Sequence, residues 1–141
     1  DEGRPGPRRL FLSANRAPAA MHRAPIWHRL SRNELLGTLR GLGGAPAEIL
    51  DSPELMDIYE PILRADLESI EKFRPQPLLP LSVPLDLLSG EEDPIDSADI
   101  ALWGQETTGP AELHRFAGGH FFLFQQWPRI GELIARRLSA G

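Results

Sequence analysis

The sequence has no cysteine among its 141 residues, which excludes a disulfide framework, a thiolate nucleophile and a thiolate metal site. No apolar run approaches the ~20 residues that cross a bilayer, and residues 1–9 lack the apolar core of a secretory signal. The net charge is −5 and no basic stripe is visible, so nucleic acid is not an expected partner. We therefore expect a soluble, cytoplasmic protein that binds neither membranes nor nucleic acids.

The order of the apolar segments predicts a single domain of the α/β class. Hydrophobic residues make up 41% of the chain and charged residues 25%, which is ordinary for a globular protein. Short apolar runs at residues 9–14, 83–89 and 111–116 predict buried strands. Helical patterns follow at residues 97–106, where Ser97 is the expected N-cap, and at 127–138. Strands that alternate with helices in this way predict a parallel sheet with right-handed crossovers.

Residues 31–73 interrupt this alternation with a predicted run of helices. Ser31 begins a capping box with the glutamate three residues later, and a glycine pair from Gly43 ends the first helix. A single helical turn follows, and Pro53 then occupies the first position of another helix. Pro61 is expected to interrupt that helix, because proline removes a backbone donor and clashes with the preceding turn.

Proline and glycine mark the expected loops. Residues 1–7 are polar and rich in both, and residues 15–25 contain two prolines without a clear period. Four prolines between Pro75 and Pro84 indicate a linker that returns the chain to the sheet. Residues 118–124 are expected to form a glycine-hinged loop after the last strand.

Two chemically capable residues follow the ends of consecutive strands. Asp93 lies in an acidic turn just before Pro94, and His120 follows the pair Gly118 and Gly119. An acid after one strand and a histidine after the next is the spacing with which an α/β hydrolase presents two residues of its catalytic triad. Each also has a purely structural interpretation: the aspartate as a turn former, and the histidine as a loop residue.

Several stretches resemble a type II (editing) thioesterase, the α/β hydrolase that accompanies polyketide and nonribosomal peptide synthetases. The resemblance rests on LRGLGGAP, PILRADL, SGEEDP and GGHFFL, and it covers the chain from about residue 9 to its end. It implies that Asp93 and His120 are the triad acid and base, and that residues 31–73 form a helical lid. The family's nucleophile motif, G-x-S-x-G, does not occur in these residues. We therefore expect residues 1–141 to be the C-terminal part of one α/β-hydrolase domain.

The resemblance also implies a reaction and a partner. The expected reaction is hydrolysis of acyl groups from the phosphopantetheine thiol of an acyl or peptidyl carrier protein, with no cofactor and with a monomeric complete protein. The triad serine would lie outside this chain. Two alternatives remain open: a catalytically inactive module that binds carrier proteins, and an esterase of another α/β-hydrolase family.

Other candidate site residues are weaker. Glu92 is the second choice for the triad acid. Ser13 lies at a strand end, as a nucleophile would, but lacks the flanking glycines and the following helix. His22, His28 and His114 have no partner at metal-ligand spacing, so no metal site is expected.

Overall fold

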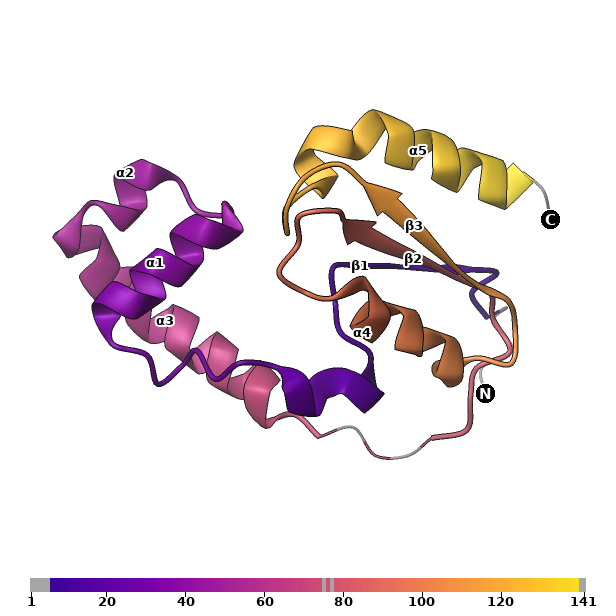
Figure 1. Ribbon diagram of the computed structural model, residues 1–141, viewed down its shortest axis with the longest axis horizontal. Coiled ribbons are helices and arrows are strands. Elements are labelled where there is room, and N and C mark those ends of the chain that lie inside the picture. The colour runs from indigo at the N-terminus through magenta and orange to yellow at the C-terminus, as the bar shows by residue number, and fades with distance from the viewer. Residues whose placement is uncertain (1–5, 75, 77, 140–141) are drawn as a thin grey trace.

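The chain forms a three-stranded parallel sheet covered by helices on both faces, with a separate group of helices to one side (Figure 1). The computed structural model describes residues 6–74, 76 and 78–139. The predicted loop at residues 1–5 and the linker residues Pro75 and Pro77 therefore lie outside the described part. The elements are β1 (Leu10–Ser13), the 3₁₀ helix η1 (Pro18–Arg23), α1 (Arg32–Leu42), α2 (Ala47–Leu50), α3 (Pro53–Lys72), β2 (Leu85–Gly90), α4 (Ser97–Ala101), the 3₁₀ helix η2 (Leu102–Glu106), β3 (Ala111–Phe116) and α5 (Leu123–Ser139).

The middle strand, β2, is buried along its whole length between β1 and β3. Side chains alternate across it, so Leu85 and Leu87 pack with Ile100 of α4 on one face. On the other face Leu88 packs with residues of β3 and α5, including Phe122, which is fully buried. The predicted parallel sheet is confirmed, with helices in the connections between its strands. The right-handed sense of these connections stays a prediction.

The helices beside the sheet depart from the predicted boundaries. Asp96, not Ser97, caps α4, because its carboxylate accepts a hydrogen bond from the Ala98 amide at 2.9 Å. The helix is α-helical only through Ala101 and then tightens to a 3₁₀ helix. Helix α5 begins earlier than predicted and continues through Pro128, its sixth residue, although proline removes one backbone donor there.

The predicted helical run at residues 31–73 is present as α1, α2 and α3. The capping box at Ser31 is confirmed, and Gly43 takes the left-handed conformation, with φ of 76°, that ends α1. The predicted interruption at Pro61 is wrong, because α3 continues through it. Ion pairs that Glu60 makes with Arg32 of α1 and with Arg64 hold the helix together on either side of the proline.

The segment after β1 is more ordered than the predicted loop. It contains η1, whose Ala20 is fully buried, and the backbone amide of Ala17 donates to the Asp99 carbonyl at 3.1 Å. Arg16 and Arg23 both donate to the Asp99 carboxylate. These bonds fix η1 against α4.

Among the described residues, no helix combines the length and apolar character that crossing a membrane requires.

Candidate active site

The turn after β2 and the loop after β3 approach each other closely. The backbone amide of Glu92 donates to the Gly118 carbonyl at 3.1 Å. A Cβ on Gly90 would lie 2.4 Å from the carbonyl oxygens of both Gly118 and Gly119. Gly118 itself has a φ of 115°, which favours glycine. The glycines in SGEEDP and GGH therefore allow these two loops to meet.

This approach brings Asp93 and His120 into contact. The His120 Nδ1 lies 3.2 Å from each carboxylate oxygen of Asp93. The Asp93 side chain is buried, and its Oδ1 also accepts a hydrogen bond from the Ile95 amide at 2.9 Å. The His120 ring is one quarter exposed (25%) and meets the Phe121 ring edge-on. The acid is thus held by the backbone, and it orients the imidazole.

The weaker candidates do not join this pair. Glu92 is exposed, and the carboxylate that contacts His120 is that of Asp93. The Ser13 hydroxyl is buried in β1 and has no hydrogen-bond partner in the described part of the chain, His120 included.

The exposed part of His120 lines an apolar cavity of about 280 Å³. The sheet contributes the loop after β1 and the His120 loop, while α1 and α3 contribute Leu42, Leu67 and Ile70. Phe121 reaches toward the chain after α1, where a Cβ on Gly44 would lie 2.0 Å from its ring. The cavity is lined by Ala14, Asn15, Arg16, Met21, Ala24, Pro25, Trp27, Leu42, Leu67, Ile70, Glu71, Ile95, His120 and Phe121.

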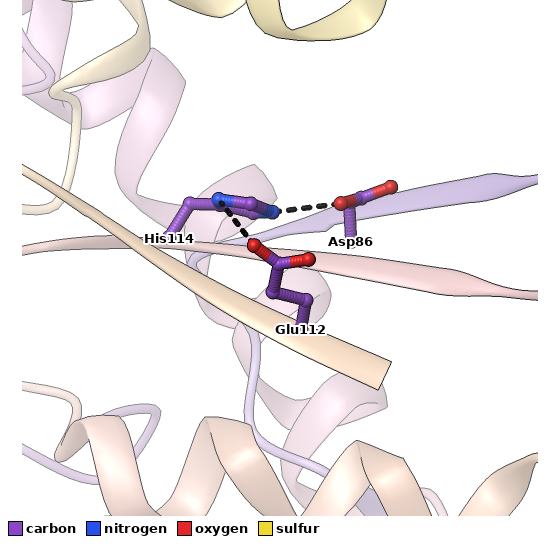
Figure 2. A group of neighbouring side chains, drawn as sticks. All are labelled: Asp86, Glu112 and His114. Atoms are coloured by element: carbon purple, nitrogen blue, oxygen red, sulfur yellow. Dashed lines mark hydrogen bonds and ion pairs between the residues drawn. The ribbon is translucent and has the colours of Figure 1, made fainter. Parts of the chain in front are cut away.

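A second polar cluster lies toward the other end of the sheet (Figure 2). Strand register places Asp86 opposite Glu112, and His114 is two residues further along β3 on the same face. The His114 Nε2 lies 2.7 Å from Asp86 Oδ1, and its Nδ1 lies 3.8 Å from Glu112 Oε1. Sequence reasoning expected no ligand partners for His114, and it missed this group.

The charges around this cluster favour an ion-pair network over a metal centre. Arg9 contacts the Asp86 carboxylate at 2.5 Å, and Arg137 of α5 contacts both Asp86 and Glu112. Burial works to raise the pKa of Asp86, but the hydrogen bonds from Arg9 and His114 outweigh it and lower that pKa. Two guanidinium groups already neutralise the two carboxylates and would repel a divalent cation. The network therefore ties β1 and α5 to the sheet.

A parallel sheet with crossover helices, and an acid–histidine pair at its carboxyl edge, is the arrangement of an α/β hydrolase. The family model for the thioesterase domain matches residues 2–138. A probable cadicidin biosynthesis thioesterase of Streptomyces griseus is 34% identical over 134 residues, covering 94% of this chain and 37% of the relative. Thioesterase PikA5 of Streptomyces venezuelae is 34% identical over 135 residues, covering 94% of this chain and 47% of the relative.

Solved structures agree with these matches. The type II thioesterase BorB from the borrelidin biosynthetic cluster superimposes with a TM-score of 0.78 at 33% identity, covering 93% of this chain and 54% of BorB. The chain belongs to the thioesterase family, and the resemblance to type II thioesterases is confirmed. It spans less than half the length of the two curated relatives described above.

Proposed function

We propose that this chain is the acid–base part of a thioesterase that hydrolyses acyl groups from the phosphopantetheine thiol of carrier proteins. One observation carries the proposal. The His120 imidazole contacts the buried Asp93 carboxylate through Nδ1 at 3.2 Å, and its ring also lines an apolar cavity. A base oriented on one side and open to a cavity on the other is what acyl transfer to a hydroxyl requires.

In the proposed mechanism, Asp93 and His120 act on a serine that is not part of this chain. With Nδ1 facing the carboxylate, Nε2 of His120 is the atom that takes the serine proton as the oxygen attacks the thioester carbonyl. The imidazolium then gives this proton to the departing thiolate, which leaves an acyl-serine. The same nitrogen next accepts a proton from water as the water attacks, and returns it to the serine oxygen as the acid leaves. Asp93 holds the ring and stabilises its charged form.

Residues 31–73 are proposed to act as a lid over this site. Helices α1 and α3 contribute Leu42, Leu67 and Ile70 to the cavity that contains His120, and Phe121 packs beside Gly44. An acyl chain in the cavity would therefore touch the helical group as well as the sheet. The proposed partner is an acyl or peptidyl carrier protein, in line with relatives that are thioesterases of biosynthetic pathways.

A serine-directed fluorophosphonate tests the triad. The native protein is treated with the probe, and its intact mass is measured. The proposal expects one adduct on a species heavier than the 15.7 kDa of this chain. Absence of an adduct would favour the inactive carrier-binding module, and an adduct on a 15.7 kDa species would direct attention to a serine within this chain, such as Ser13.

A further inference from the structure

A second apolar cavity, of about 350 Å³, adjoins the cavity that contains His120. It lies between η1, the C-terminal end of α3 and Trp103 of η2, and it does not include the histidine. Met21 projects from η1 and Ile70 from α3 at the border between the two. The residues that line both cavities are Asn15, Arg16, Met21 and Ile70.

The lining of the second cavity is mostly apolar, and three of its polar groups are bonded within the protein. The Arg16 Nε donates to Asp99 at 3.2 Å, the Ser69 hydroxyl donates to the backbone of its own helix at 2.9 Å, and the Trp103 indole donates to the Asn15 carbonyl at 2.9 Å. An occupant rich in amides, such as a pantetheine arm, would lose its water without gaining these partners. An alkyl chain has no hydrogen bonds to water to lose, and its burial is favourable.

Hydrogen bonds also fix the wall of the His120 cavity where α3 meets the segment after η1. Glu71 of α3 accepts from the backbone amide of Trp27 at 2.7 Å and from the His28 ring, and Arg64 donates to the His28 carbonyl at 2.8 Å. The segment between η1 and α1 is thereby tied to α3. The border residues Met21 and Ile70 can change rotamer within this fixed frame, and the methionine is especially adaptable.

We propose that the second cavity holds the distal part of a long acyl chain whose carbonyl end lies at His120, and that Met21 and Ile70 determine which chain lengths pass. The inference rests on the proposed thioesterase function. Ligand cavities usually measure roughly 300–1,000 Å³, so the 280 Å³ beside His120 suits a short acyl group alone. A longer chain needs the adjoining space.

Tryptophan quenching tests this without requiring catalysis. Trp27 lines the His120 cavity, Trp103 lines the second cavity, and the remaining tryptophan, Trp127, is exposed. Two double variants of the full chain are made, each with Trp127→Phe. Adding Trp103→Phe leaves Trp27 as the single fluorescent reporter, and adding Trp27→Phe leaves Trp103. The probes are amides of terminally brominated six-carbon and twelve-carbon acids with aminopantetheine, in which an amine replaces the thiol. Bromine quenches a neighbouring indole, and an amide resists hydrolysis. We expect the short probe to quench Trp27 only, and the long probe to quench Trp103.

Ile70→Phe should block the border and abolish quenching of Trp103 by the long probe, while quenching of Trp27 by the short probe persists. Ile58→Phe is the matched control, because Ile58 lies on the same helix, is similarly exposed (63% against 59%) and lines neither cavity. Two results would overturn the inference and leave the proposed function standing. In the first, the probes quench Trp27 but never Trp103; in the second, quenching of Trp103 by the long probe survives Ile70→Phe. If neither tryptophan is quenched by either probe, acyl binding itself fails, and the proposed function fails with it.

Discussion

Replacement of Gly90 by alanine should separate the two loops that hold Asp93 and His120. The added Cβ would lie 2.4 Å from the carbonyl oxygens of Gly118 and Gly119. A relaxed carbon–oxygen contact is ~3.3 Å, so β2 and the loop must part by about 0.9 Å. Both obstacles are backbone atoms, so a side-chain rotation cannot relieve the clash.

Two consequences follow from this displacement. Overpacking of this kind costs ~1–3 kcal/mol, which should lower the Tm of the full chain by roughly 3–10 °C. The His120–Asp93 hydrogen bonds are already 3.2 Å long, so the same movement would break them. A misplacement near 1 Å can cost about 10²-fold in rate, and we expect a loss of that order in acyl release by the native protein.

The assay is thermal unfolding of the full chain, followed by circular dichroism, together with the rate of acyl release by the native protein. Gly41→Ala is the control, because a Cβ there meets nothing within 4 Å. It lies in the last turn of α1 and should stabilise the helix by up to ~1 kcal/mol. A Gly90→Ala variant with the unaltered Tm and rate would refute the argument that glycine is needed where the loops meet.

Three further predictions concern packing and charge. Gly44→Ala should lower the Tm, because the added Cβ would lie 2.0 Å from the Phe121 ring. The same substitution should not lower the Tm of a Phe121→Ala variant, and equal losses of Tm in both backgrounds would contradict this contact. Phe122→Ala should cost ~3–5 kcal/mol in denaturant unfolding, because the ring is fully buried and stacks on Phe116 at 5.6 Å, and a cost below 1 kcal/mol would contradict this packing. Burial works to raise the pKa of Asp99, but hydrogen bonds from two arginines lower this pKa below its ordinary 3.8. The stability that the Asp99 carboxylate contributes is therefore complete above pH 3.8 and is lost as the pH falls through the lowered folded-state pKa. Asp99→Asn should make the free energy of unfolding less dependent on pH in this acid range, and an unchanged pH dependence would contradict the lowered pKa.

The sheet could be predicted because each strand is a short apolar run between turn signals. Ala111–Phe116 was predicted with its observed bounds, and β2 differs only at its ends. Local sequence patterns were less informative where long-range contacts determine the structure. Pro61 does not break α3, because ion pairs with α1 hold that helix. Asp86 precedes two leucines in β2, and a charged residue within a buried strand was the one feature of the sequence that could have indicated the ion-pair network.

The candidate site could be predicted only in part. The motifs SGEEDP and GGH placed Asp93 and His120 after neighbouring strands, and parallel topology brings such positions to one edge of the sheet. The contact of His114 with Asp86 depends on strand register, which periodicity does not reveal. The two cavities depend on how η1 and α3 pack together, and no single segment of the sequence encodes that arrangement.

The rate of acyl release from an acylated carrier protein, measured for the native protein and its histidine variants, tests whether His120 is the base. His120→Ala should lower the rate by ~10²–10⁴-fold, the usual contribution of a positioned general base. His22→Ala is the matched control, because His22 is exposed on η1 and lines neither cavity, so its rate should be unchanged. A His120→Ala variant that releases the acyl group at the unaltered rate would contradict the account.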